Sequence, residues 1–169
     1  MSDNPYASPV ATPLDVTVSD EGGSIDGMPF ASQNRRLVNF LVDNVMTQIV
    51  SSLAGGALGA AYAQSNGGQI TQDQATTLQL MGMGLGLLVV LLYFFLMEAT
   101  MGATVGKLLT STRVVDAGGG KASVGKLIGR TFARLIPFEP VSFLFGDKTT
   151  GWHDSLSGTR VVDIRAGRR

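Results

Sequence analysis

The chain has 169 residues, enough for one domain, and its 13 basic and 13 acidic residues balance, so overall charge suggests no nucleic-acid partner. It contains no cysteine, which excludes disulfides, thiolate catalysis and cysteine-based metal sites. Charged residues make up only 15% of the chain, against roughly 25% in soluble domains, which favours a membrane protein.

The N-terminal stretch, residues 1–30, is rich in Pro, Ser, Asp and Gly and contains no Lys or Arg. It has too few large apolar side chains to offset the entropy of an ordered chain. We therefore predict a disordered, acidic tail over 1–30.

The middle of the chain lacks basic residues: none occurs in the roughly 70 positions between Arg36 and Lys107. Cations are costly in hydrocarbon and concentrate in cytoplasmic loops. Two apolar segments in this region, 37–62 and 78–99, are long enough at about 1.5 Å per residue to cross a core of about 30 Å. The pattern predicts a transmembrane hairpin with its polar link, 63–77, outside and both termini in the cytoplasm.

The first predicted helix carries a polar face of Arg36, Asn39 and Asp43, and the second carries Glu98 near its cytoplasmic end. An ionisable group inside a membrane marks a candidate functional site. A structural ion pair between Arg36 and Asp43 is the equally weighted alternative.

Small residues recur at helical spacing as Gly55 and Gly59 in the first helix and as Gly82 and Gly86 in the second. Such GxxxG patches let backbones approach closely. They predict a hairpin that is tight in its outer half and splayed at the cytoplasmic end, where Arg36, Asp43 and Glu98 would gather around a polar cleft open to the cytoplasm. Self-association of protomers through the same patches is the alternative.

The cytoplasmic part begins at Lys107. Residues 108–116 are predicted to form a strand before a Gly-rich turn, and a helix capped by Ser123 is predicted to run to residue 136. Its stripe of Lys126, Arg130 and Arg134 indicates a basic amphipathic helix on the membrane surface. A third, short membrane crossing over 123–145 is the alternative, and residues 164–169 would form a basic C-terminal tail.

One pentapeptide occurs twice: Thr112 to Asp116 repeats as Thr159 to Asp163. Two similar Val-rich runs predict a small two-stranded cytoplasmic sheet. The predicted fold is therefore an all-α membrane protein with this minor β element.

The residue types of a hydrolase occur together in His153-Asp154-Ser155, but adjacent residues do not make a triad and there is no nucleophile elbow. His153 is the only histidine, so a multi-histidine metal site is excluded. We expect no catalytic residues, no metal, no cofactor and no enzyme activity.

Several segments together resemble the RDD family of bacterial membrane proteins, which is named for one arginine and two aspartates. Arg36 and Asp43 match the arginine and first aspartate, and Asp154, within the His153 to Thr159 segment, matches the second. The segments Thr104 to Lys107 and Arg113 to Asp116, together with Arg130, also match family positions. Asn39 is a departure, because the family commonly has a small apolar residue there.

The resemblance covers about residues 31–163 and implies a multi-pass protein of the bacterial cytoplasmic (inner) membrane. Transport of unidentified ligands, including cation–proton exchange in some members, has been suggested for the family. We expect either a transporter or transport subunit or a membrane-anchored scaffold subunit of a larger complex. In the first, an oligomer would bind a small cation or proton at Asp43 in the cleft, gated by Arg36 and Asp154. Either role requires the lipid bilayer and a homo-oligomer or membrane-complex partner, and Asp154 is predicted to neutralise Arg36.

Overall fold

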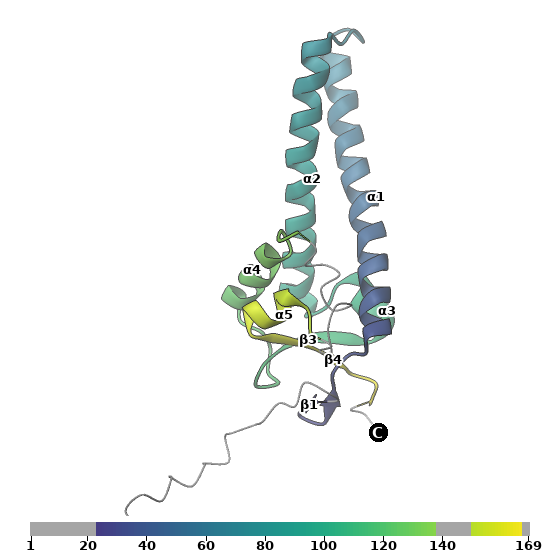
Figure 1. The fold of residues 1–169 in the computed structure, drawn as a ribbon. Helices are drawn as coiled ribbons and strands as arrows, with labels where there is room; N and C mark the ends of the chain where they lie inside the picture. The colour runs from purple at the N-terminus through teal and green to yellow at the C-terminus, as the bar shows by residue number, and fades with distance from the viewer. Residues whose placement is uncertain (1–22, 138–149, 167–169) are drawn as a thin grey trace, which may run out of the picture.

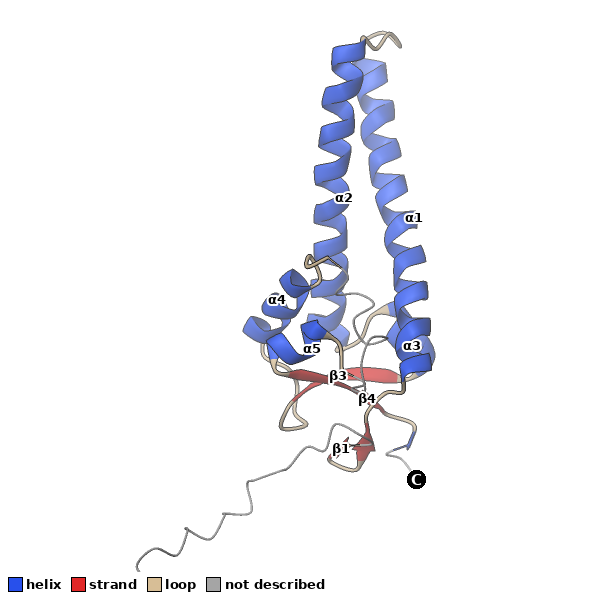
Figure 2. Ribbon diagram, in the orientation of Figure 1, coloured by secondary structure: helices blue, strands red, loops and turns tan. Residues whose placement is uncertain are grey.

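The computed structural model describes residues 23–137 and 150–166, which form a long helical hairpin standing on a small cap (Figure 1). The hairpin consists of α1 and α2, and the remaining elements make up the cap (Figure 2). In chain order the elements are β1 (Ser24–Ile25), β2 (Met28–Pro29), α1 (Gln33–Ser65), α2 (Gln72–Met101), α3 (Val105–Thr110), β3 (Thr112–Asp116), α4 (Val124–Ala133), α5 (Trp152–Ser157) and β4 (Thr159–Asp163).

Both hairpin helices are long and apolar enough to cross a membrane, and no residue in the most apolar stretch of α2 is buried. The two predicted helices are thus confirmed as helices, and each is longer than the predicted 37–62 and 78–99. A capping box between Thr71 and Gln74 starts α2, since each side chain accepts a bond from the other's backbone N–H. Gly102, in the left-handed conformation at φ 68°, ends it.

The two helices diverge toward the cap (Figure 1), but the predicted glycine patches do not hold their other ends together. A Cβ atom added at Gly55, Gly59, Gly82 or Gly86 would meet no atom within 4 Å outside its own helix backbone. The prediction that these glycines pack α1 against α2 is therefore wrong. Their free surface leaves self-association as an untested prediction.

The repeated pentapeptides pair as predicted: β3 and β4 are antiparallel, with Val114 opposite Val161 and Val115 opposite Arg160. Successive strand residues point to opposite faces, so the double valine in each strand supplies two cores. On one face Val114 and Val161 pack with Leu127 of α4 and with Phe95 and Ala99 of α2. On the other, Val115 and Val162 pack with Ile25 beside the β1–β2 hairpin.

Two predicted boundaries of the cap were wrong. Residues 24–29 form the β1–β2 hairpin, and the Ala31 N–H donates to the Val161 carbonyl at 2.9 Å, so the predicted tail does not extend to residue 30. Residues 108–110 belong to α3 rather than to a strand, and β3 begins only after Ser111, which has a left-handed φ of 55°. The fold is mostly helical with two small sheets, not all-α.

The predicted amphipathic helix is shorter than expected. α4 ends at Ala133 and at about 1.5 Å per residue its 10 residues span about 15 Å, half of a bilayer core. It does not cross a membrane as a helix. The rest of the predicted 123–145 segment, from residue 138, lies outside the described residues, as do 1–22 and 167–169 of the predicted tails.

Candidate functional site

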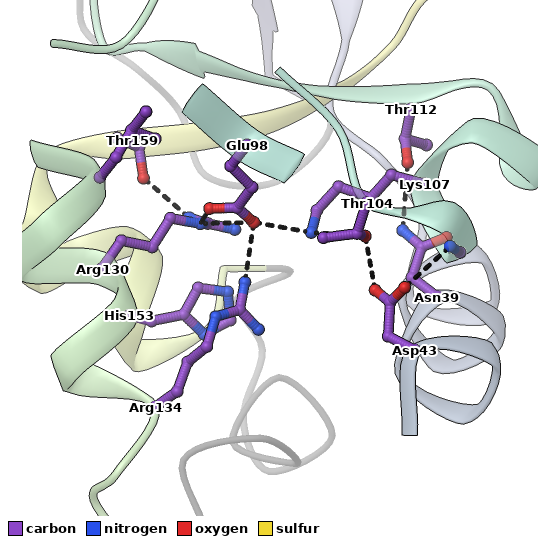
Figure 3. Close-up of polar contacts among 12 residues, drawn as sticks. Asn39, Asp43, Glu98, Thr104, Lys107, Thr112, Arg130, Arg134, His153 and Thr159 are labelled. Atoms are coloured by element: carbon purple, nitrogen blue, oxygen red, sulfur yellow. Dashed lines mark hydrogen bonds and ion pairs between the residues drawn. The ribbon is translucent and has the colours of Figure 1, made fainter. Parts of the chain in front are cut away.

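Seven ionisable side chains meet where the hairpin joins the cap, and six of them are buried. Figure 3 labels Asp43, Glu98, Lys107, Arg130 and Arg134 of this set. Arg134 is the exception, with 14% of its side chain exposed. We call this set the ionic cluster; it comprises Arg36, Asp43, Glu98, Lys107, Arg130, Arg134 and Asp154.

Asp154 joins three helices of the cluster. One carboxylate oxygen pairs with Arg36 of α1 and the other with Arg130 of α4, which confirms the predicted contact with Arg36. His153 Nε2 lies 3.4 Å from Asp154, and the Gly151 N–H donates to it at 3.3 Å. Burial would raise the pKa of Asp154, but Arg130 and Arg36 outweigh this and hold it well below its usual range.

Glu98 of α2 is the second centre of negative charge, and three cations surround it. Its oxygens lie 3.0 Å from Lys107 Nζ, 3.1 Å from Arg130 Nε and 2.9 Å from Arg134 Nη2. The guanidinium of Arg134 also stacks 4.0 Å above the ring of Phe94. Burial lowers the pKa of Lys107, and the attraction of Glu98 opposes that change.

The predicted basic stripe of α4 therefore faces inward, not toward lipid. Arg130 is fully buried, Arg134 contacts Glu98, and Lys126 pairs with Asp116 at the edge of the sheet. The face that α4 leaves exposed is apolar and carries Val124, Ile128 and Phe132. The cations therefore do not form one exposed stripe: carboxylates of α2 and α5 hold Arg130 and Arg134 inside the protein, and Lys126 stays partly exposed. That this helix lies on a membrane surface stays a prediction.

Asp43 binds the start of α3. Its Oδ1 accepts from the hydroxyl of Tyr93 at 2.7 Å and from the N–H of Gly106 at 2.8 Å, and its Oδ2 accepts from Thr104 at 2.5 Å. The alternative of an Arg36–Asp43 ion pair was wrong, because Arg36 pairs with Asp154. Tyr93 was not predicted, since nothing in its sequence position indicates that it faces Asp43.

Asn39, one turn before Asp43, binds the other end of α3. Its amide lies 2.5 Å from the Thr110 hydroxyl and 3.1 Å from that of Thr112. A Cβ added at Gly106 would come within 2.5 Å of the Asn39 carbonyl oxygen. The polar face of α1 therefore packs against α3 and hydrogen-bonds to both of its ends.

Two adjoining hollows lie beside the ionic cluster. The inner cavity, of about 50 Å³, is lined by the four cations of the cluster together with Asp43, His153 and neighbouring residues. The outer cleft, of about 180 Å³, lies between α1 and α2 and is lined by Phe40, Asn44, Thr47, Gln48, Val90, Phe94 and Arg134. Phe40, Phe94 and Arg134 line both hollows, so the two adjoin. Arg36, Asp43 and Glu98 are absent from the described lining of the outer cleft, so the predicted cytoplasmic cleft around these residues stays a prediction.

Within the described part of the chain, no three acidic or histidine side chains gather in a way that would hold a metal ion. The arrangement therefore offers positive charge: guanidinium and ammonium groups surround a small cavity, which adjoins the cleft between α1 and α2.

Comparison with known proteins agrees with this architecture. The model of the RDD family matches residues 30–158, most of the chain. No curated protein and no solved structure matches it. The matched region contains α1 to α5 and every residue of the ionic cluster, and on that match the chain belongs to the RDD family.

Proposed function

We propose that this protein is a membrane-embedded transport subunit whose cleft between α1 and α2 binds a small solute. In this proposal α1 and α2 cross the bacterial cytoplasmic membrane and the cap lies in the cytoplasm. The apolar side chains of the hairpin support the crossing, since Leu53, Leu80 and Met83 are each at least 64% exposed and need lipid or other helices to cover them. The basic residues at the cap end support the orientation.

The position of α4 also supports a membrane. Its exposed Ile128 and Phe132 lie beside Leu91, Leu92 and Phe95 of α2 around a purely apolar hollow of about 230 Å³. The apolar surface of the hairpin therefore continues onto the cap, and a helix with such a face lies in the interfacial layer of a bilayer.

The topology has a direct test because the chain has no cysteine. Asp73→Cys, at the far end of the hairpin, should react with an impermeant maleimide on intact cells. Lys121→Cys, exposed on the cap, should react only after lysis. Equal reactivity of both positions in intact cells, or recovery of the protein in the aqueous fraction without detergent, would refute the membrane hairpin.

The observation that carries the transport role is the cleft between α1 and α2, which holds the polar side chains of Asn44, Thr47 and Gln48 and shares Arg134 with the cavity of buried cations. Two helices cannot enclose a pathway, so several copies or partner helices must complete it. The predicted binding of a cation or proton at Asp43 requires its three donors to be released first. Arg134 is the cation of the cluster that lines the cleft itself, beside Asn44, Thr47 and Gln48.

Transport is tested by reconstitution in liposomes, with ion flux followed by dyes that respond to pH and to membrane potential. Gln48→Leu, which makes the cleft wall apolar, should slow the flux at least severalfold. Ser52→Leu, one turn further along α1 and outside the cleft, serves as the matched control and should not. Flux equal to that of empty liposomes, or equally slowed by both variants, counts against transport.

A scaffold role remains the second candidate, and one surface of the cap favours it. Trp152 and Leu156, one turn apart on α5, are 50% and 67% exposed. A partner protein should then copurify with the chain in mild detergent at fixed stoichiometry. The Leu156→Ser variant should no longer retain this partner. A chain that purifies without a partner and still conducts ions would favour transport instead.

A further inference from the structure

The inner cavity carries an imbalance of charge. Four cations of the ionic cluster line it, whereas the cluster contains three carboxylates: Asp43, Glu98 and Asp154. Among the described carboxylates, lysines and arginines of the cluster, one positive charge is therefore unmatched. Buried charges are normally paired, so a surplus cation in a buried cluster points to a missing anion.

Hydrogen-bond donors are also left over, on the same side chains. Arg36 Nη2, Arg130 Nη2 and Arg134 Nε are buried and have no hydrogen-bond partner in the described structure. Arg130 is fully buried and Arg36 is 5% exposed, so both side chains have very little surface in contact with bulk water. Glu98 Oε2 also lacks an aligned hydrogen bond, but it lies 3.1 Å from Arg130 Nε in an ion pair and is not free.

We propose that the inner cavity binds an oxyanion, one phosphate group in size, through the guanidinium groups of Arg36, Arg130 and Arg134. Guanidinium forks match the geometry of phosphate oxygens, and three of them contribute a donor that the protein leaves unused. A volume of about 50 Å³ exceeds the roughly 10–15 Å³ that one water needs by this kind of measure. Asp43 also lines the cavity, but its repulsion is offset because Tyr93, Thr104 and Gly106 donate to its oxygens.

The outer cleft gives the anion a route, since the two hollows share Phe40, Phe94 and Arg134. An oxyanion in the inner cavity would be the solute that enters through the cleft, and its role in transport rests on the proposed function. Binding itself is measured without flux, so the two can fail separately. The phosphate group can belong to free phosphate or to a lipid headgroup, and the experiment separates these sources.

The test uses the full chain, purified in neutral detergent and, in parallel, in nanodiscs with and without phosphatidylglycerol. Titration calorimetry with inorganic phosphate in detergent should show saturable binding of one phosphate per chain if the ligand is free in solution. Native mass spectrometry of the nanodisc sample should show one retained phosphatidylglycerol per chain if the source is lipid. Saturable binding in neither medium overturns the proposal.

The matched variants are Arg134→Lys and Lys126→Gln. Arg134→Lys keeps a charge beside Glu98 but removes the unpartnered Nε–H, so binding should weaken about tenfold or more. Lys126→Gln removes a cation of α4, the helix that ends just before Arg134. Lys126 pairs with Asp116 away from the cavity, so binding should be unchanged. Equal weakening by both variants would show general charge attraction and overturn the site.

A second measurement covers the case in which Arg134→Lys does not fold. A ligand that binds only the folded state raises the unfolding temperature. Phosphate, or phosphatidylglycerol in the lipid arm, should therefore raise the Tm of the wild-type chain relative to chloride, or neutral lipid, at matched ionic strength. No difference in either comparison contradicts the proposal.

Discussion

At the scale of single residues, the ionic cluster explains why so many charges are tolerated between the hairpin and the cap. Burying a charge costs several kcal/mol unless a partner and further hydrogen bonds compensate for it. Asp154 meets both conditions, because two guanidinium groups and the N–H of Gly151 surround it. Removing Asp154 would leave Arg36 and Arg130 buried without this partner, so its two ion pairs help to fix the position of α1 relative to α4 and α5.

This coupling between Arg36 and Asp154 is measurable in a double-mutant cycle. Arg36→Ala and Asp154→Ala should each lower the free energy of unfolding by about 3–5 kcal/mol, since each strands a buried charge. The double variant should lose at least ~1 kcal/mol less than the sum, measured by unfolding in mild detergent. The control cycle is Arg35 with Asp163, a more exposed pair 3.1 Å apart, whose coupling should be about 0–1 kcal/mol. Additive losses in the first cycle would contradict direct contact.

The pH dependence of the cap follows from the lowered pKa of Asp154. A carboxyl whose folded pKa is depressed stabilises the protein fully above its unfolded pKa, about 3.9, and the contribution falls as pH drops from there toward the folded pKa. The contribution of Asp154 to the unfolding temperature should therefore be constant from pH 7 to 5 and decline below about pH 4. We expect the difference in Tm between wild type and Asp154→Asn to follow this course. If the Tm difference between wild type and Asp154→Asn shrinks between pH 7 and 5, a lowered pKa of Asp154 does not account for it.

How much of this cluster the sequence predicts depends on the residue. The polar face of α1 and the Arg36–Asp154 contact follow from charge and family pattern. The inward direction of Arg130 and Arg134 does not follow, because a stripe at helical spacing has the same pattern whether it faces lipid or buried carboxylates. The partner that decides between them, Glu98, lies more than 30 residues earlier in the chain.

At the scale of secondary-structure elements, the strands were predictable and α3 was not. The repeated pentapeptide indicated two paired strands, and it forms β3 and β4, although the first strand had been predicted to begin at residue 108. In α3, the apolar Leu108 and Leu109 favoured a strand. Asn39 and Asp43 stabilise this single helical turn through contacts with Thr104, Gly106 and Thr110, which local pattern does not show.

Gly106 tests the close packing of α3 on α1. Gly106→Ala would put a Cβ 2.5 Å from the carbonyl oxygen of Asn39 and 2.8 Å from its Cα, so the two elements must separate. We expect a loss of about 1–3 kcal/mol in unfolding free energy, as for overpacked cores. Gly125→Ala, in α4, meets no atom within 4 Å and should be neutral or stabilising. The same effect at both positions would count against this packing.

At the scale of the whole molecule, the cluster holds the cap ends of α1 and α2 apart. Arg36 ties the start of α1 to α5, and Glu98 ties the end of α2 to α3 and α4, so the cleft between the helices is built into the monomer. The other ends of the helices lack such a cluster, and their apolar surfaces are exposed. The described ion pairs between helices thus lie at the cap, whereas large apolar side chains along the hairpin are exposed within a single chain.

Assembly through the glycine patches of α2 is the remaining prediction at this scale. Gly82 and Gly86 lie one turn apart and meet nothing within the chain, so their surface is free for a second copy. Gly82→Leu should abolish oligomers seen by native mass spectrometry in mild detergent, while the unfolding temperature of the cap stays within a few degrees of wild type. Gly84→Leu is the control: it adds the same side chain on another face of the same helix, where a Cβ also meets nothing. Oligomers that survive Gly82→Leu, or that both variants disrupt equally, would place the contact between copies elsewhere on the hairpin.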